Sequence, residues 1–254
     1  MRRAPVTDLQ HRLDQAAHTQ SPVTLPQETT HYLIDVLRLT VGEQVELFDG
    51  LGLSAIIEII STSPKLEVEI RTTHRQEKAN QTPRVILCQS IPKGDRWEWL
   101  IEKCTELGVD EIYPVVSART VVKIADKKLD KKITRWESIM QGAARQSGRT
   151  LFTKIHHPTT LKSLVHTTDG EHTHIVASLH HTTQPIDQII NARTQTGDIF
   201  LWVGPEGGWT PDELQLLEHD LGAAFTTLGE HVLRAETAAV SVVTLAKFFT
   251  QSSP

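Results

Sequence analysis

The chain has 254 residues, 39% of them hydrophobic, and a formal net charge of -5. This length and composition suit one large domain or two modest ones, and we expect two. The acidic balance gives no overall attraction to nucleic acid, although a local basic patch can exist on an acidic protein. The sequence has no apolar run that could span a bilayer and no apolar segment after its first basic residues. We therefore expect a cytoplasmic protein with no signal peptide and no membrane partner.

Two cysteines are present, Cys88 in an apolar run and Cys104 in a helical pattern. So few cysteines indicate reduced thiols and argue against a disulfide framework. Neither cysteine resembles a zinc site, and the histidine pairs are scattered in polar surroundings. We expect no metal.

The residues from Val41 to Arg71 read as short strands with turns between them: EQVELFDG, LSAIIEII and KLEVEIR. The stretch from His74 to Pro83 has almost no apolar residues and ends in a proline, which is typical of a linker between domains. We therefore predict a small β-rich domain at residues 1–75 and a second domain at residues 76–254.

Beyond this boundary, strand and helix patterns alternate. The apolar run from Val85 to Cys88 is followed by helical spacing from Trp97 to Leu107, with Asp95 at the expected N-cap. The later patterns predict strands at Ile112 to Val116, Ile175 to Leu179 and Ile199 to Val203, and helices at about Lys131 to Gln146, Thr210 to Glu218 and Ala235 to Phe249. Such alternation favours an α/β fold with a largely parallel sheet covered by helices.

A glycine loop, Gly204 to Gly208, follows one predicted strand directly in the stretch LWVGPEGGWTPDEL. Ligands of open α/β sheets bind beyond the carboxyl ends of strands, so this position favours a binding loop. Thr210, Pro211 and Glu213 then make a complete helix start. The loop matches neither the Walker nor the dinucleotide pattern, and it has no lysine for a triphosphate. Taken alone, it is read equally well as a tight turn.

A second segment, LGEHVLRAETAAVSVVTLAKF from Leu228 to Phe248, passes from a turn into a strongly apolar helix. Its first turns hold Arg234, Glu236 and Thr237. Charged groups at the head of a buried helix need partners or a ligand. Two interpretations stay open: a ligand site, or a structural Arg234–Glu236 pair with Thr237 as a cap.

With these two segments the chain resembles the RsmE family of SPOUT-class RNA methyltransferases, which methylate N3 of a uridine in small-subunit ribosomal RNA. The matching blocks cover nearly the whole length in the family's order: HYLIDVLRL at 31–39, LFDG at 47–50, KGDRWEWLIEKCTELGV at 93–109, SARTVVK at 117–123, RWESIMQGAARQSGR at 135–149, GPEGG at 204–208 and LGEHVLRAETA at 228–238.

This resemblance implies an N-terminal PUA-like β-barrel that helps bind RNA, and a C-terminal α/β domain whose trefoil knot forms the pocket for S-adenosylmethionine. It also implies a homodimer and, as partner, 16S ribosomal RNA or the small ribosomal subunit. By resemblance, the cofactor-binding positions are Leu179, Val203, Gly204, Pro205, Glu206, Gly208, Leu228, Gly229, Leu233, Arg234, Thr237 and Ala238.

Arg234 and Glu206 are the catalytic candidates. A fixed cation at Arg234 would stabilise the negative charge that develops on uracil as its N3 proton leaves. Glu206 could orient the cofactor or accept a proton, or equally could tie the loop to backbone amides, and the sequence does not identify a general base. Five cations are candidate RNA contacts: Arg3 in the small domain, and Arg38, Lys93, Arg119 and Arg149, which lie inside the matching blocks. For each one alone, a solvated surface charge is the alternative interpretation. The alternatives are a non-catalytic RNA-binding protein that keeps the fold, or a methyltransferase for a different nucleotide.

Overall fold

The computed structural model describes residues 1–19, 22–76, 83–121, 128–168, 170–178, 182–193 and 197–251. The chain divides into two compact units. The first unit contains Met1–Ala79 together with Ala144–Phe152, and the second contains Asn80–Ala143 and Thr153–Pro254.

The first unit is built on a four-stranded sheet in the order β1-β2-β3-β4. Strand β1 runs parallel to β2, whereas the other two strand pairs are antiparallel. Val45, Leu47 and Ile57 alternate with more exposed neighbours and are fully buried, so one face of the sheet is apolar. The strands predicted between residues 41 and 71 are confirmed. The strand bounds are β1 (Arg2–Pro5), β2 (Gln44–Phe48), β3 (Leu53–Ser61) and β4 (Glu67–Arg75).

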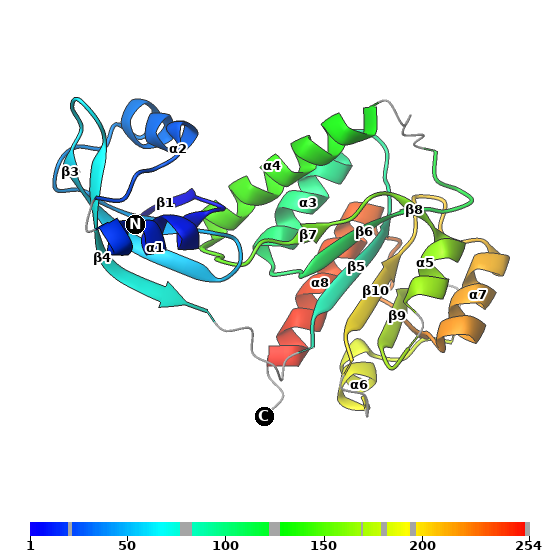
Figure 1. The fold of residues 1–254 in the computed structure, drawn as a ribbon. Coiled ribbons are helices and arrows are strands. Elements are labelled where there is room, and N and C mark those ends of the chain that lie inside the picture. Colours follow the sequence, from blue (N-terminus) through cyan, green and yellow to red (C-terminus); the bar gives the residue numbers. More distant parts are fainter. Residues whose placement is uncertain are drawn as a thin grey trace. The chain divides into compact units, whose positions relative to one another are not determined.

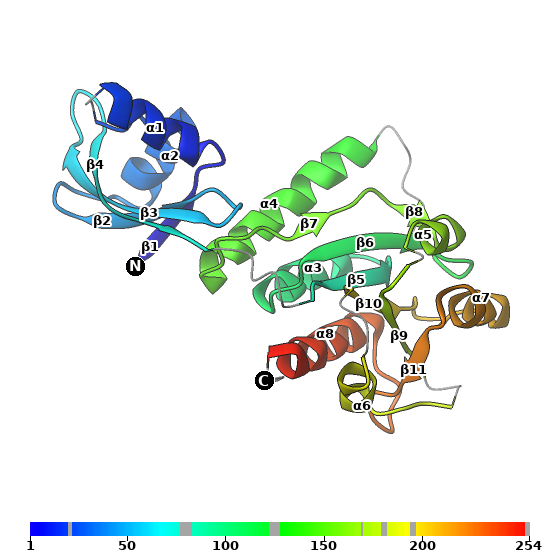
Figure 2. The ribbon, with the colours of Figure 1, turned by 60° about the horizontal axis from the view of Figure 1, so that its bottom comes forward.

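Helical segments accompany this sheet (Figure 2): α1 (Leu9–Thr19), α2 (Gln27–His31) and the π-helical turn η1 (Tyr32–Val36). Leu9, Leu13 and Ala16 recur on one face of α1 and are buried in the same core as the sheet. These helices were not predicted, because α1 carries only this narrow apolar stripe among polar residues.

Residues from much later in the chain complete the first unit. Phe152 N donates a 2.8 Å hydrogen bond to the carbonyl oxygen of Gly50, and Gly52 N donates one of 3.1 Å to Thr150 O. The rings of Phe48 and Phe152 meet edge-on, with centroids 5.7 Å apart. The turn after β2 is therefore held by backbone and side-chain contacts that no local sequence pattern predicts.

The second unit has a seven-stranded sheet in which every strand pair is parallel. The order is β11-β9-β10-β5-β6-β7, with β8 also beside β6. All five residues of the central strand β10, IFLWV, are buried, as expected for a parallel strand covered on both faces. The strand bounds are β5 (Val85–Ser90), β6 (Glu111–Val116), β7 (Lys154–Ile155), β8 (Thr159–Thr160), β9 (Thr173–Ala177), β10 (Ile199–Val203) and β11 (Ala224–Thr226).

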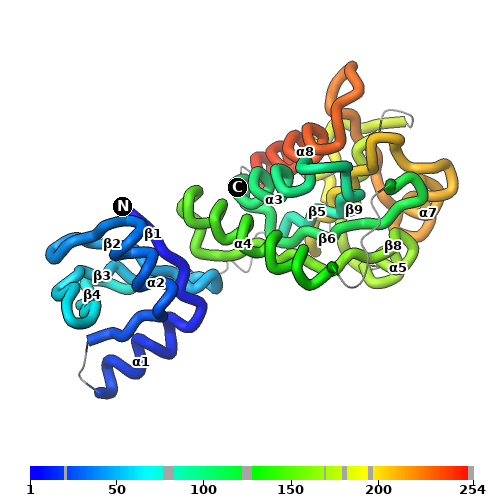
Figure 3. Tube along the Cα trace, turned by 90° about the horizontal axis from the view of Figure 1, so that it is seen from above, coloured from blue at the N-terminus to red at the C-terminus, as the bar shows by residue number. Residues whose placement is uncertain are grey.

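Helices cover both faces of this sheet (Figures 1 and 2), which confirms the predicted α/β fold with a parallel sheet. Helices α3, α6 and α8 lie on one face, and α3 and α8 run side by side in Figure 3 as well. Helices α5 and α7 cover the other face, where Leu164 and Leu217 pack against Trp202. The helix bounds are α3 (Arg96–Glu106), α4 (Leu129–Ser147), α5 (Leu161–Thr167), α6 (Ile186–Asn191), α7 (Pro211–Leu221) and α8 (Ala235–Gln251).

Among the described residues, no helix has both the length and the apolar character needed to cross a membrane.

Candidate functional site

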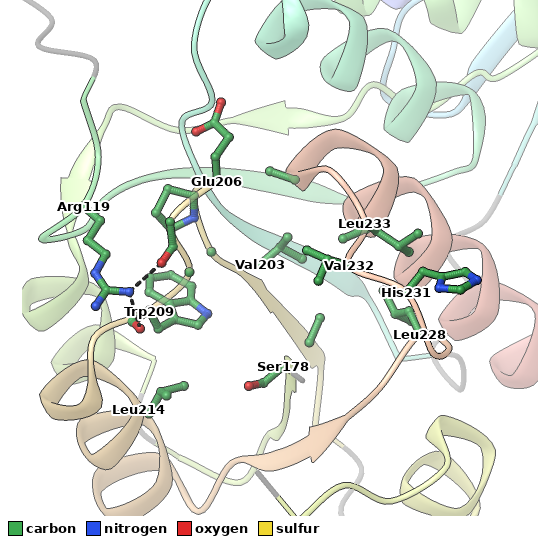
Figure 4. A pocket seen from close by; sticks show the side chains of 17 residues that line it. Arg119, Ser178, Val203, Glu206, Trp209, Leu214, Leu228, His231, Val232 and Leu233 are labelled. Carbon is green, nitrogen blue, oxygen red and sulfur yellow. Dashed lines mark hydrogen bonds between the residues drawn. The ribbon is translucent and has the colours of Figure 1, made fainter. Parts of the chain in front are cut away.

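A pocket opens at the carboxyl ends of β9 and β10 (Figure 4), which is where parallel sheets bind ligands. Its walls come from the end of β9, the glycine loop, the segment before α8 and the first turn of α8 itself. Arg119 and the α7 residue Leu214 close one side. The lining residues are Arg119, Ala177, Ser178, Val203 to Trp209, Leu214, Leu228, His231, Val232, Leu233, Ala235 and Ala238.

Local hydrogen bonds set the shape of the glycine loop. Gly208 N donates to the carbonyl oxygen of Pro205 at 2.8 Å, and Gly208 has a φ of +67°, which favours glycine. A Cβ on Gly204 would lie 3.3 Å from both the backbone N and the Nε1 of Trp209. The loop therefore needs small residues where it folds back on Trp209.

The helix that follows the loop starts with the predicted capping box. Thr210 Oγ1 accepts a hydrogen bond from Glu213 N at 3.3 Å, and Glu213 Oε2 accepts one from Thr210 N at 2.8 Å. The second carboxylate oxygen, Glu213 Oε1, accepts a 2.7 Å bond from Ala118 N. Glu213 thus fixes the helix start and also ties it to the segment after β6.

Arg119 comes from this same segment and approaches the glycine loop from the side (Figure 4). Its Nη1 donates to the carbonyl oxygen of Gly207 at 2.5 Å and to that of Trp209 at 3.5 Å. Arg119 is predicted as an RNA contact, whereas the structure places its guanidinium on the glycine loop.

Glu206 points away from the interior of the pocket in Figure 4. Its Oε1 accepts hydrogen bonds from Lys93 N and from Arg96 Nη1, each at 3.2 Å. Partial burial raises the pKa of Glu206, but the hydrogen bonds from its own backbone and from Lys93, with the positive charges of Arg96 and Lys93, outweigh burial and lower that pKa. Glu206 is therefore ionised at neutral pH and holds the loop to the start of α3.

A second hollow lies beside the pocket, and we call it the Trp99 hollow. It is lined by Asp95, Arg96, Trp99, Arg234, Glu236 and Thr237. Arg96 Nε lies 3.6 Å from Glu236 Oε1. Among the described residues, the ion pair of Glu236 is with Arg96 and not with Arg234, so the structural pair considered from the sequence is not formed.

The predicted cofactor positions divide between these two hollows. Those in the pocket wall are Val203, Gly204, Pro205, Glu206, Gly208, Leu228, Leu233 and Ala238. Arg234 and Thr237 line the Trp99 hollow instead, and Gly229 lies in the exposed turn next to Leu228. Leu179 lies outside the described residues.

Several pocket residues were not predicted. Ala177 ends β9 and Ser178 follows it directly, and the three-dimensional order of the strands brings them beside the glycine loop. His231 and Val232 lie within the LGEHVLRAETA block, so their position between two predicted residues was a usable signal. Trp209 follows GPEGG directly and could have been found in the same way.

The other predicted RNA contacts differ in how accessible their side chains are. Arg3 has a side chain only 8% exposed, paired with Glu46 at 2.8 Å, with further bonds to the carbonyl oxygens of Ala144 and Arg149. Its guanidinium lies over the Phe48 ring, 4.4 Å from the centroid, so Arg3 is engaged inside the first unit. The remaining three are more accessible: Arg38 and Lys93 are exposed and Arg149 is half-buried.

Among the described residues, no group of three or more His, Cys, Asp or Glu side chains is arranged to hold a metal ion.

Two family models match this chain: an RNA methyltransferase domain over residues 78–247 and an RNA methyltransferase PUA domain over residues 25–71. The chain is 30% identical over 229 residues to the ribosomal RNA small subunit methyltransferase E of Bacillus subtilis, which covers 88% of this chain and 89% of that relative.

Two solved structures are similar over 88% of this chain and 90% of their own chains, each at 30% identity. One is a ribosomal RNA small subunit methyltransferase E from Neisseria gonorrhoeae bound to S-adenosyl methionine, with a TM-score of 0.75. The other is a putative methyltransferase from Legionella pneumophila in complex with the bound cofactor SAM, with a TM-score of 0.74.

Proposed function

Because the chain belongs to the ribosomal RNA small subunit methyltransferase E family, we propose that it transfers a methyl group from S-adenosylmethionine to N3 of a uridine in 16S ribosomal RNA. The observation that carries this proposal is the pocket at the ends of β9 and β10. The two segments that wall it, GPEGG and LGEHVLRAETA, are those in which the sequence resembles the family, and two cofactor-bound structures share the chain's fold.

The pocket residues fit S-adenosylmethionine. Val203, Leu228 and Leu233 give apolar walls for an adenine ring and a thioether chain, between backbone groups of the glycine loop. Trp209 Nε1 is buried in this wall and has no hydrogen-bond partner among the described residues, so it has a donor free for a ligand. When bound, the cofactor supplies an electrophilic methyl group on its sulfonium, and the protein binds, orients and excludes water.

Arg234 is the proposed catalytic cation. It lies between Leu233 and Ala235, which both line the pocket, and its exposed side chain borders the Trp99 hollow. A cation at this position stabilises negative charge on a uracil ring from which a proton departs. Glu206, held ionised by Lys93 and Arg96, acts as a positioning group for the cofactor loop rather than as the proton acceptor.

RNA binding is assigned to the PUA domain and to three cations as phosphate contacts: the exposed Arg38 and Lys93 and the half-buried Arg149. A uracil inside a helix cannot present N3, so the target base has to be unpaired or turned out of its stack. We further propose a trefoil knot around the cofactor pocket, a homodimer as the functional assembly, and a cytoplasmic location, where ribosomal subunits are made.

The test is transfer of radiolabelled methyl from S-adenosylmethionine to small ribosomal subunits taken from a strain that lacks this protein, followed by nucleoside mass spectrometry. We expect label in 16S RNA as 3-methyluridine at one position. Labelling of a different nucleoside would overturn the assigned base. Cofactor binding with no transfer to subunits or to naked RNA would favour a non-catalytic RNA-binding protein.

A further inference from the structure

The Trp99 hollow has an aromatic ring exposed to solvent beside two arginines. Trp99 is 45% exposed, whereas Trp97, two residues earlier on the same helix, is 3% exposed and packs edge-on against Trp136. Helix α3 therefore needs Trp97 for its core and does not need Trp99. A large aromatic side chain left exposed beside cations is a surface suited to stacking of a nucleic-acid base.

The hollow also contains a buried acceptor with no partner. Glu236 is 9% exposed, and its Oε2 has no hydrogen-bond partner among the described residues. The other oxygen, Oε1, lies 3.6 Å from Arg96 Nε. A buried carboxylate oxygen without a donor is costly, so its presence indicates a ligand that brings one.

The hollow adjoins the pocket that we assign to the cofactor. Arg234 and Glu236 flank Ala235, which lines the cofactor pocket. Arg96 joins the two segments, because Nη1 bonds Glu206 of the glycine loop and Nε faces Glu236. A base seated on Trp99 would thus border the cofactor pocket.

The polar groups of the hollow suit the edge of a uracil. On its Watson–Crick edge uracil presents O4, N3–H and O2, which act as acceptor, donor and acceptor. Among the residues that line the hollow, Arg96 and Arg234 carry donors and Glu236 carries acceptors, and a base with N3–H opposite Glu236 would have an acceptor on either side for an arginine. Cytosine has no hydrogen on N3 and would bring its own acceptor against the carboxylate. On the basis of the proposed function, we propose that the Trp99 hollow binds the target uracil, with Trp99 stacked on its ring and Glu236 Oε2 accepting the N3 proton.

The chemistry balances without another reactant. The N3–H bond breaks and its proton passes to Glu236 Oε2, which leaves the electron pair on N3. That pair then forms the N3–carbon bond while the carbon–sulfur bond of the donor breaks, and the sulfur keeps its electron pair. Because the methyl carbon takes the in-plane position that the proton left, proton transfer has to come first. Glu236 then releases its proton to solvent. The charged groups around it are Asp95, Arg96, Arg234 and, through Arg96, Glu206.

The first experiment uses Glu236→Gln, with Glu218→Gln on the exposed face of α7 as the matched control. We expect kcat with small subunits to fall by about 10²- to 10⁴-fold in Glu236→Gln, since this is the usual contribution of a general base. S-adenosylmethionine affinity should stay within twofold, and the control should keep wild-type activity.

Rescue of activity in Glu236→Gln distinguishes a role of Glu236 as proton acceptor from a purely structural role. Raising the pH, or replacing uridine by 5-fluorouridine, makes the N3 proton easier to remove, so the deficit of Glu236→Gln relative to the wild-type enzyme should shrink under both conditions. An unchanged kcat, or a deficit that neither condition reduces, overturns the role of Glu236. Failure of the wild-type enzyme to make 3-methyluridine would instead defeat the proposed function.

The second experiment measures RNA binding and does not depend on turnover. Trp99→Ala should weaken binding of the target RNA by about 5- to 150-fold, the range that stacking of one base supplies. The same RNA with an abasic site at the target nucleotide should bind wild type and variant equally, and Trp99→Phe should restore most of the loss. Equal weakening for both RNAs, or no weakening for either, means that Trp99 does not stack on the target base.

Discussion

Arg119 Nη1 donates a 2.5 Å hydrogen bond to the carbonyl oxygen of Gly207, so that a cation from the segment after β6 holds the loop that follows β10. The methylene groups of Arg119 also lie close, because a Cβ on Gly207 would be 3.3 Å from Arg119 Cδ. The loop is thus supported by one side chain through both polar and apolar contacts.

Replacing Arg119 by alanine should weaken S-adenosylmethionine binding by roughly tenfold, since a charge-assisted hydrogen bond contributes about 1.5–3 kcal/mol and partial exposure reduces that value. Calorimetric titration of S-adenosylmethionine into the wild type, Arg119→Ala and the control Lys162→Ala measures this loss of affinity. If Arg119 acts on the loop, the slope of RNA affinity against salt stays unchanged. A smaller slope with unchanged cofactor affinity would show instead that Arg119 contacts RNA phosphates.

The capping box at Thr210 should stabilise the protein through the Thr210 hydroxyl, which a serine would also provide. Thr210→Ala removes the hydroxyl that accepts from Glu213 N and should lower the free energy of unfolding by about 1 kcal/mol. Thr210→Ser keeps that acceptor and should cost much less. Thermal melts of the three proteins compare them, and equal losses for alanine and serine would show that the methyl group and not the cap is responsible.

The sequence predicted those parts of the fold that depend on local periodicity. The run IFLWV identified a buried strand, and TPDE identified the helix start with its cap, because each signal lies within a few neighbouring residues. The packing of Phe152 on Gly50 had no such signal, since it joins residues far apart in the chain. For the same reason Ser178 was missed in the pocket: its position there follows from strand order.

Roles of charged residues were less predictable than their positions. Arg3 was interpreted as an RNA contact because of its charge, and Arg119 because of its charge and its matching block, but a sequence cannot say which carbonyl oxygens or carboxylates a guanidinium will meet. Glu236 was considered as part of a ligand site or as a partner for Arg234, its near neighbour on the helix. Its contact with Arg96 on α3 depends on the packing of α3 beside α8.

The two thiols should be inert in the folded protein. Cys88 and Cys104 are both fully buried, and burial raises the pKa of each, with the negative charge of Glu111 adding to the effect at Cys88. Thiolate is the reactive form, so Ellman's reagent should detect no thiol in the native state at mildly alkaline pH. In guanidinium chloride it should detect the 2 cysteines of the chain. Rapid reaction of the native protein would contradict this burial.

Glu206 should make the stability of the second unit depend on pH. Its folded pKa is lower than the ordinary value of 4.5, so its ionised form contributes stability above that value, and the contribution is lost as the pH falls through the folded pKa. Glu206→Gln should therefore melt below the wild type at neutral pH, and the difference should vanish at strongly acidic pH. A difference that persists in acid would mean that the side chain acts by packing and not by charge.

Gly50 should be the least replaceable residue of the turn after β2, because a side chain there would clash with a neighbouring ring. A comparison with Gly42 separates this clash from backbone strain. Gly50 has a φ of +80° and Gly42 one of +88°, so alanine is strained at both, by about 1–3 kcal/mol. At Gly42 a Cβ meets no atom within 4 Å, whereas at Gly50 it would lie 2.0 Å from Phe152 Cδ2. Gly42→Ala measures the strain alone, and Gly50→Ala should melt well below it.

The additional loss of stability in Gly50→Ala, relative to Gly42→Ala, should come from Phe152, because the atoms that a Cβ at Gly50 would meet belong to the Phe152 ring. Adding Phe152→Leu, which shortens the side chain, should then recover part of the stability in the Gly50→Ala background while it lowers stability in the wild-type background. Thermal melts of the single and double variants give this coupling. Simple additivity of the two changes would show that the ring of Phe152 does not press on the turn.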